Sequence, residues 1–222
     1  MLDKIKILEN TKGKSSLRNR NNLLSVFAEF EGKKVKVYEA FNQSQVDLRL
    51  FIEKEASVSK FFPRVLHHEG LYIAEEFVEG TPGHECDVDF LKDEIAKLIF
   101  ALRAIDYREC TWDYLKHIHE RVGLRYTPLS LPNHINYNDL AIRNISLTND
   151  GIKVIDNEFL ACNNAWFMNV INSSFLTDPN LNFGIDDQLI QKYHRIRKLW
   201  SGKKPKFYKT AYRVIRQRLG GY

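Results

Sequence analysis

Residues 135–159 read Ile135-Asn-Tyr-Asn-Asp-Leu-Ala-Ile-Arg-Asn-Ile-Ser-Leu-Thr-Asn-Asp-Gly-Ile-Lys-Val-Ile-Asp-Asn-Glu-Phe159. Within this segment, residues 145–147 (Ile-Ser-Leu) and 152–155 (Ile-Lys-Val-Ile) are short stretches rich in branched apolar side chains, which favour β-strands. Between them, residues 148–151 are Thr-Asn-Asp-Gly, which is a typical turn sequence. We therefore predict a β-hairpin here, and the organisation of the remaining chain is inferred outward from it.

The predicted hairpin brings oxygen-bearing side chains together. If Leu147 faces Ile152, Asn144 and Asp156 come to the same end of a ladder whose strands are about 4.8 Å apart. Amide and carboxylate oxygens suit a Mg²⁺ ion that substrate phosphates also bind. Asp139, in the preceding loop, is then free to accept a proton from a substrate hydroxyl. The alternative is that all three are turn and cap residues, since Asp and Asn favour turns.

The rest of the chain changes from strand-like to helix-like patterns. β-Branched and aromatic residues predict strands over residues 24–31, 35–41 and 71–78. Apolar residues recurring every three or four positions predict helices over residues 46–60, 88–105 and 112–122. A strand-rich front and a helix-rich back favour an α+β protein with a cleft between two lobes.

The composition is that of a globular protein. The 222 residues are 44% hydrophobic and 27% charged, which argues against collagenous, low-complexity and wholly disordered chains. No uncharged apolar run approaches the ~20 residues that a membrane-spanning helix needs. Residues 1–6 lack the apolar block of a secretory signal. The three cysteines are widely spaced, so we expect a reducing, cytoplasmic location.

Residues 188–222 form a basic tail. They contain 11 Lys or Arg and no Asp or Glu, whereas the remaining residues carry 22 basic and 28 acidic side chains. Such a tail can hold phosphates, the anionic face of a membrane or nucleic acid, or it can be solvated. Apolar residues at helical spacing in 189–200 and 208–219 predict two amphipathic helices, either facing a core or lying on a membrane.

The hairpin segment resembles a known family. Residues 139–144 (Asp-Leu-Ala-Ile-Arg-Asn) and 155–158 (Ile-Asp-Asn-Glu) are similar to the catalytic and metal-binding segment of protein-kinase-like small-molecule phosphotransferases. That superfamily includes aminoglycoside phosphotransferases, choline kinases and lipopolysaccharide core heptose kinases. The resemblance implies an α+β, protein-kinase-like two-lobed fold with a small antiparallel-sheet N-lobe and a reduced helical C-lobe.

The resemblance implies roles for individual side chains. Asp139 would orient or deprotonate the acceptor hydroxyl, and Asn144 and Asp156 would hold Mg²⁺ on the phosphates of ATP. Glu158 would support the metal or the acceptor. Catalysis of this kind is mostly positioning and charge neutralisation, so a few well-placed oxygen atoms suffice.

Lys36 resembles the family's lysine that steadies the ATP phosphates, because it lies in the strand Val-Lys-Val-Tyr ahead of the other elements. The alternative is a solvent-facing strand lysine. The following helix offers Glu53 and Glu55 as ion-pair partners of Lys36, and we prefer Glu55 from its place in the helix.

The resemblance extends to other nucleotide contacts. The segment before the loop at residues 79–83 resembles the strand and hinge that meet adenine, through backbone groups of Glu76, Phe77 and Val78. No Gly-rich phosphate loop is present. The nearest candidate donors are the hydroxyl and N–H groups of Ser15 and Ser16.

Departures from the family pattern in the catalytic loop, the phosphate loop and the length after the hairpin bear on function. Besides the missing Gly-rich loop, Tyr137 stands where the family usually has histidine, and Asn138 replaces the usual small glycine. Only 63 residues follow Phe159, which is short for a large helical substrate lobe. A small-molecule or glycan substrate is therefore expected over a protein substrate.

The expected organisation is an N-lobe over residues 1–80, a C-lobe with catalytic loop and hairpin over 81–187, and the basic tail over 188–222. The expected function is an ATP- and Mg²⁺-dependent kinase acting on a hydroxyl of a sugar or other small acceptor, such as an envelope glycan. The tail would contact the anionic inner membrane face. The alternative is a pseudokinase or binding module without turnover. Nucleic-acid binding through the tail ranks below both.

Overall fold

A computed structural model describes residues 6–8, 23–107, 116, 134–137, 142–157 and 160–163 of the chain. Backbone contacts divide the chain into two compact units. The first unit combines residues 1–87 with 142–160, and the second combines residues 88–141 with 161–222.

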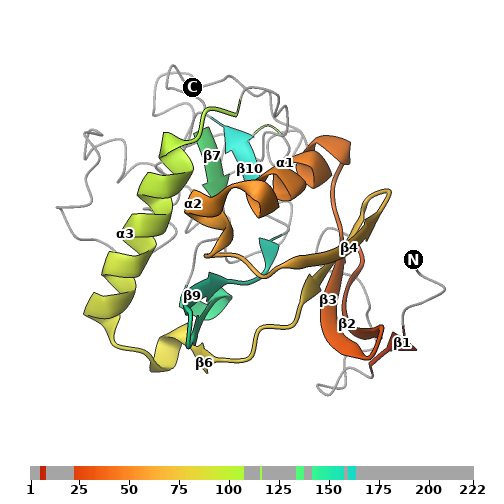
Figure 1. Cartoon of the computed structure of the whole chain (residues 1–222), viewed down its shortest axis with the longest axis horizontal. Coiled ribbons are helices and arrows are strands. Elements are labelled where there is room, and N and C mark those ends of the chain that lie inside the picture. Colours follow the sequence, from red (N-terminus) through yellow and green to blue (C-terminus); the bar gives the residue numbers. More distant parts are fainter. Residues whose placement is uncertain are drawn as a thin grey trace, which may run out of the picture. The chain divides into compact units, whose positions relative to one another are not determined.

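The first unit contains a five-stranded antiparallel sheet with the order β1-β2-β3-β5-β4 (Figure 1). Its strands are β1 (Lys6–Ile7), β2 (Ser25–Phe30), β3 (Lys33–Glu39), β4 (Val65–Glu69) and β5 (Tyr72–Glu76). The β2–β3 hairpin turns through Glu31 and Gly32, which both have positive φ angles. The strands predicted over residues 24–31, 35–41 and 71–78 are confirmed, within a few residues at their ends.

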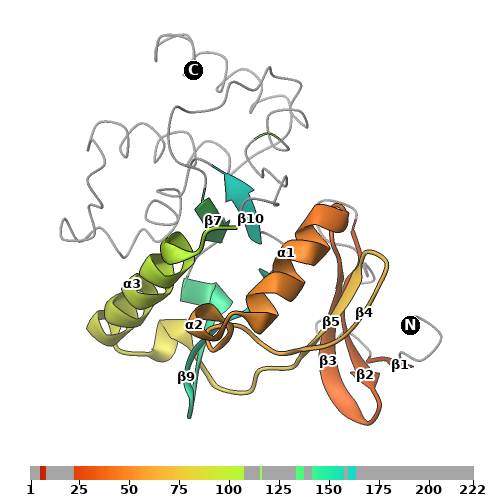
Figure 2. The same cartoon turned by 45° about the horizontal axis from the view of Figure 1, so that its top comes forward.

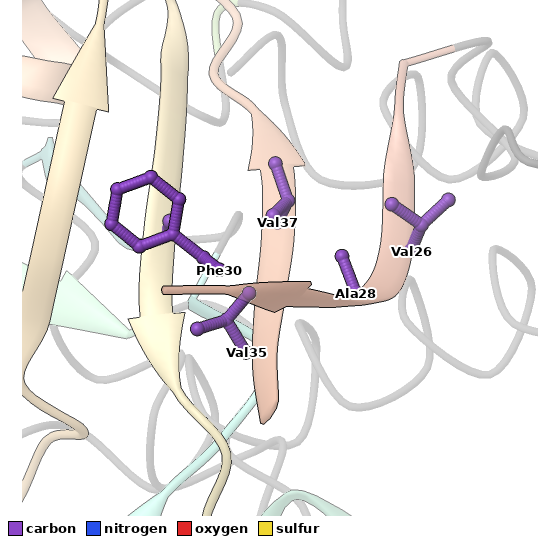
Figure 3. Close-up of a cluster of buried hydrophobic side chains, with 6 residues drawn as sticks. Val26, Ala28, Phe30, Val35 and Val37 are labelled. Atoms are coloured by element: carbon purple, nitrogen blue, oxygen red, sulfur yellow. The ribbon is translucent and has the colours of Figure 1, made fainter. Parts of the chain in front are cut away.

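One face of this sheet carries a cluster of buried apolar side chains (Figure 3). They come from alternate positions of β2 and β3 and from β5: Val26, Ala28, Phe30, Val35, Val37 and Ala74. Fully burying one side chain the size of valine contributes about 1.5–3 kcal/mol. Because successive side chains of a strand point to opposite faces, Lys34, Lys36 and Tyr38 of β3 lie on the other face.

The helix α1 (Gln43–Lys54) lies beside the sheet in both views (Figures 1 and 2). It begins at the N-cap Asn42, whose side chain accepts a hydrogen bond from the N–H of Gln45 at 3.1 Å. Capping of this kind satisfies a donor that the helix itself cannot pair. The helix packs on the face that carries Tyr38, in a second buried cluster with Ala40, Val46 and Ile73.

The single helix predicted over residues 46–60 is interrupted at Glu55. This residue has an extended conformation (φ −84°, ψ 100°), and the short helix α2 (Ala56–Ser59) follows it. The N–H groups of Val58 and Ser59 both donate to the carbonyl of Glu55, at 3.0 and 2.8 Å. A new helical turn therefore begins at Glu55, and the sequence periodicity did not indicate this break.

The predicted hairpin is present. It consists of β8 (Ile145–Thr148) and β9 (Gly151–Val154), and Leu147 pairs with Ile152 as expected. The short strand β6 (Thr81–Pro82) pairs with β8, giving the order β6-β8-β9. The chain just before β6 passes so close to β8 that residue 80 must be glycine, because a Cβ atom there would collide with the carbonyl oxygen of Leu147.

The hairpin belongs with the N-terminal sheet, although the expected boundary at residue 80 places it in the 81–187 lobe. The N–H of Val154 donates to the carbonyl of Phe61 at 2.7 Å. Lys153 Nζ donates to the carbonyl of Phe62 at 3.2 Å. These bonds join the hairpin to the chain that follows α2.

In the second unit, the helix α3 (Val88–Ala104) contacts the strand β7 (His134–Tyr137), which pairs with β10 (Leu160–Asn163). The helix buries one stripe, formed by Leu91, Ile95, Leu98, Ile99 and Leu102. It agrees with the helix predicted over residues 88–105. Except for Lys116, the helix predicted over 112–122 lies outside the described residues, as does the whole basic tail. None of the helices within the described ranges has the length and apolar character that crossing a membrane requires.

Candidate active site

Lys36 and Asp156 form an ion pair through Nζ and Oδ1. Lys36 lies in the middle of β3, and its side chain is 15% exposed; Asp156 directly follows Ile155 at the end of the hairpin and is 37% exposed. Hydrogen bonds between charged groups are about twice as strong as those between neutral groups. The structure therefore brings together the lysine and the carboxylate that were singled out for phosphate and metal binding.

The backbone at Asp156 adopts an uncommon conformation. Its φ angle is +77°, in the left-handed region that non-glycine residues rarely occupy. Conformations of this kind cost about 1–3 kcal/mol, persist only when the surroundings impose them, and cluster at functional sites. The backbone conformation at Asp156 is thus imposed by its neighbours.

Asn144 lies at the same end of the hairpin as Asp156. It ends the short 3₁₀ helix η3 (Ile142–Asn144), its side chain is buried, and its carbonyl accepts the N–H of Ile155 at 2.8 Å. The two predicted ligands therefore supply one amide and one carboxylate, both hard oxygen donors of the kind that Mg²⁺ takes from a protein alongside substrate phosphates. In the described part of the chain, no three His, Cys, Asp or Glu side chains gather into a metal-binding group.

A buried polar network lies next to Asp156 within the first unit. Asn157 Nδ2 donates to both carboxylate oxygens of Glu75, at 3.0 Å each. Arg49 Nε and Tyr38 Oη donate to Glu75 Oε1, at 2.6 and 3.2 Å. All four residues are 1% exposed.

Arg49 anchors this network to two further groups. Its Nη1 donates to Glu53 Oε2 at 3.2 Å, and its Nη2 donates to the carbonyl of Pro63. Burial alone lowers the pKa of Arg49, but the negative charges around it, above all that of Glu75, outweigh burial and raise the pKa above its usual value. The guanidinium therefore stays charged in the protein interior.

The network was not found from the sequence, although a signal for it exists. Arg49 follows Val46 by three residues, so it falls on the buried stripe of its helix. Glu75 follows the buried pair Ile73 and Ala74 in β5. Two opposite charges on two buried surfaces indicate an internal ion pair, because an unpaired buried charge is too costly.

The prediction that Glu55 pairs with Lys36 is not met among the described residues. Lys36 pairs with Asp156, and Glu55 lies at the break between α1 and α2. The other candidate, Glu53, accepts hydrogen bonds from Arg49 and from the N–H of Val65, the latter at 3.1 Å.

Two backbone N–H groups of the predicted hinge are already hydrogen-bonded within the protein. The N–H groups of Glu76 and Phe77 donate to the carbonyls of Arg64 and Lys34, at 2.9 and 3.1 Å. Contacts to a base from this segment would therefore come from Val78 or from the carbonyl groups.

Two aromatic rings lie beside the hinge. Phe27 packs edge-to-face on Phe77, with ring centroids 5.5 Å apart, and Lys34 Nζ lies 3.5 Å from the centroid of Phe77. Phe27 is 48% exposed and pairs in register with Lys36 across β2 and β3. An accessible aromatic surface thus adjoins the lysine, which the sequence patterns did not indicate.

Four of the predicted site residues, Asp139, Glu158, Ser15 and Ser16, lie outside the described residues. The residue two positions before Asp139, Tyr137, ends β7 and is fully buried. The tyrosine that replaces the family's usual histidine is therefore part of the interior of the second unit.

No protein-family model matches the sequence, and no curated protein matches it. Solved structures do share its fold. The gentamicin complex of APH(2")-IIa is 11% identical, with a TM-score of 0.55 over 96% of this chain and 91% of that chain. ADP-bound aminoglycoside phosphotransferase APH(2'')-Ib is 11% identical, with a TM-score of 0.55 over 96% and 92%. Choline kinase LicA from Streptococcus pneumoniae is 12% identical, with a TM-score of 0.52 over 98% and 86%.

These similarities establish the fold. The chain has the α+β, protein-kinase-like fold of small-molecule phosphotransferases, as its hairpin segment led us to expect.

Proposed function

We propose that the chain is an ATP- and magnesium-dependent kinase that transfers the γ-phosphate of ATP to a hydroxyl of a small acceptor. The observation that supports this most is the ion pair between Lys36 and Asp156, adjacent to Asn144, on a protein-kinase-like fold. Phosphoryl transfer requires mainly that the reactants be positioned and their charge neutralised, and these residues supply both.

Each residue has a defined task in this proposal. Lys36 holds the ATP phosphates, and its neighbour Asp156 keeps it oriented. Asp156 and Asn144 hold Mg²⁺, with Glu158 as a further support for the metal or the acceptor. When bound, the metal neutralises negative charge on the phosphates. Asp139 takes the proton of the acceptor hydroxyl as the bond from oxygen to phosphorus forms and the bond from phosphorus to ADP breaks.

The nucleotide has further proposed contacts. Val78 and the carbonyl groups of Glu76 and Phe77 face the base, and Ser15 and Ser16 donate to the phosphates. Apolar and aromatic surfaces with a few polar groups are typical of such sites.

The acceptor is proposed to be a sugar or another small molecule. Proteins with this fold have been solved with gentamicin, streptomycin and hygromycin B, and others are choline kinases. The basic tail at residues 188–222 suits an anionic envelope glycan, such as a lipopolysaccharide core, made at the inner face of the membrane. Each Lys or Arg close to anionic lipid gains about 1 kcal/mol. For such an acceptor, the protein would be cytoplasmic and would contact the inner face of the membrane through its basic tail.

A pseudokinase is the second candidate. The observation that favours it is the buried Tyr137 in place of the family's histidine, together with the absence of a Gly-rich loop from the sequence. In this case the chain binds nucleotide without turnover.

One experiment separates the two candidates. The purified chain is titrated with ADP and ATP by calorimetry, with and without magnesium, and assayed with labelled ATP against aminoglycosides, choline and lipopolysaccharide core oligosaccharides. The kinase proposal predicts magnesium-dependent binding and turnover on one acceptor, both lost in Asp156→Asn. The matched control is Asp150→Asn, at the exposed turn of the same hairpin. Binding without turnover on every acceptor supports the pseudokinase, and absence of nucleotide binding refutes both.

A further inference from the structure

Two consecutive residues at the end of the hairpin are held by the two members of one cross-strand pair. Lys36 of β3 and Glu75 of β5 lie opposite each other in register. Lys36 forms the ion pair with Asp156, and Glu75 accepts two hydrogen bonds from Asn157. The strand pair that carries the proposed phosphate-binding lysine therefore also holds the residue next to the proposed metal ligand.

The strained backbone at Asp156 is anchored on both sides. On the N-terminal side, the N–H of Ile155 donates to the carbonyl of Asn144 at 2.8 Å. On the C-terminal side, the amide of Asn157 is fastened to Glu75. Asn157 Oδ1 is buried and has no hydrogen-bond partner within the described ranges, so the bonds to Glu75 are the contacts that orient this amide. Such anchors are what a φ angle of +77° requires to persist.

Holding Asn157 through Glu75 requires burying a charged carboxylate, which costs desolvation free energy. Its carboxylate and the guanidinium of Arg49 are both 1% exposed. Replacing a buried ion pair by apolar residues of similar volume is often neutral or stabilising. Stability alone therefore does not account for the pair. What the pair supplies is a carboxylate whose two oxygens are fixed in position, and an amide side chain can be oriented by such a carboxylate but not by an apolar side chain.

We propose that Arg49, Glu75 and Asn157 are positioning residues. They fix the backbone at Asp156, and thereby direct its carboxylate toward Lys36 and the magnesium-bound phosphates. This inference rests on the function proposed above, since it assigns the three residues a role through Asp156 in that same site.

Two double variants separate the positioning role from stability. Arg49→Met/Glu75→Gln removes both charges but keeps an amide oxygen that can accept from Asn157. Arg49→Met/Glu75→Leu removes the charges and the acceptor together. The two variants differ in the hydrogen bonds that residue 75 accepts from Asn157 and from Tyr38, so their difference in magnesium-dependent nucleotide binding measures the combined effect of these bonds on the site.

The readout is the affinity for ADP by calorimetry, with and without magnesium, alongside thermal unfolding. Losing the group that orients a metal ligand typically costs about 10–100-fold in metal affinity. We expect Arg49→Met/Glu75→Leu to lose the magnesium-dependent gain in ADP affinity by at least about 10-fold. The Gln-containing variant should retain most of the gain, and ADP affinity without magnesium should be the same in both.

The single variant Asn157→Ala keeps the Arg49–Glu75 pair and decides the matter if the double variants do not fold. Its matched control is Asn149→Ala, at the exposed turn of the same hairpin. If Asn157→Ala and the Leu-containing variant both keep the unaltered chain's magnesium-dependent gain, the positioning role is refuted while the kinase proposal stands. If the unaltered chain shows no such gain, the proposed function fails first and this inference with it.

Discussion

Lys36 and Asp156 are 120 positions apart in the sequence and form an ion pair in the folded protein. The lysine comes from the middle strand of the N-terminal sheet and the aspartate from the end of the 145–154 hairpin. Their meeting is the most specific structural support for phosphotransfer, because each residue was assigned to the phosphate–metal site on separate grounds.

Replacing Lys36 by methionine should strongly lower the rate of phosphoryl transfer with little effect on folding. Removing one preorganised charge from a catalytic site typically costs about 10²–10³-fold in rate. The partner Asp156 is partly exposed, and an ion pair of this kind contributes at most about 1 kcal/mol to stability. Steady-state kinetics and urea unfolding measure the two effects. Lys33→Met, at the exposed start of the same strand, is the matched control, and equal rates in both variants would contradict the role of Lys36.

The conformation of Asp156 can be tested by comparing Asp156→Gly with Asp156→Ala. Both variants lose the carboxylate, but only glycine occupies a φ angle of +77° without strain. Because the left-handed conformation costs an ordinary residue about 1–2 kcal/mol, the glycine variant should be the more stable by roughly 1 kcal/mol. The free energy of unfolding in urea gives the answer, and an alanine variant of equal or greater stability would show that the backbone there is not strained.

Phe27 should contribute to nucleotide affinity more than to stability. Its ring is 48% exposed and neighbours Phe77 and Lys36. Stacking of a base on an aromatic side chain is worth about 1–3 kcal/mol, so Phe27→Ala should weaken ADP binding by about 10-fold. Equilibrium dialysis against labelled ADP measures this. Phe100→Ala, at an exposed phenylalanine on α3, should leave the affinity unchanged, and the same affinity in both variants would exclude Phe27 from the base site.

Glu53 and Glu55 should respond differently to the same substitution. Glu53 accepts from Arg49 and from the N–H of Val65, so Glu53→Ala should lower the free energy of unfolding by about 1–3 kcal/mol. Glu55→Ala should change it by no more than about 0.5 kcal/mol and leave the rate near that of the unaltered chain. A large loss of activity in Glu55→Ala with an intact fold would restore Glu55 as the partner of Lys36.

Local patterns predicted the parts of the fold that depend on local interactions. The turn sequence at residues 148–151 and the branched apolar residues beside it predicted the hairpin. The assumed pairing of Leu147 with Ile152 is the one observed. The apolar residues at helical spacing in 88–105 likewise predicted α3. The order Lys36, helix, hinge and hairpin was enough to indicate the family of folds.

The break at Glu55 was missed because helix periodicity does not record where a helix stops when no proline or glycine marks the end. The expected division at residue 80 also differs from the observed units. Hydrogen bonds from Val154 and Lys153 attach the hairpin to the chain that follows α2, and such long-range bonds leave no trace in local composition.

By itself, the sequence determined which residues can carry the chemistry: a strand lysine, and an amide and a carboxylate at one end of a hairpin. Residue type and short-range spacing decide that much, since they set hydrogen-bonding capacity and the strand face. Tertiary structure alone decided which of these residues meet. In the folded protein, Lys36 pairs with Asp156 and not with Glu55. Arg49, Glu75 and Asn157 are enclosed in one buried network. Burial makes the pairing of those charges obligatory, and burial is a property of the folded chain.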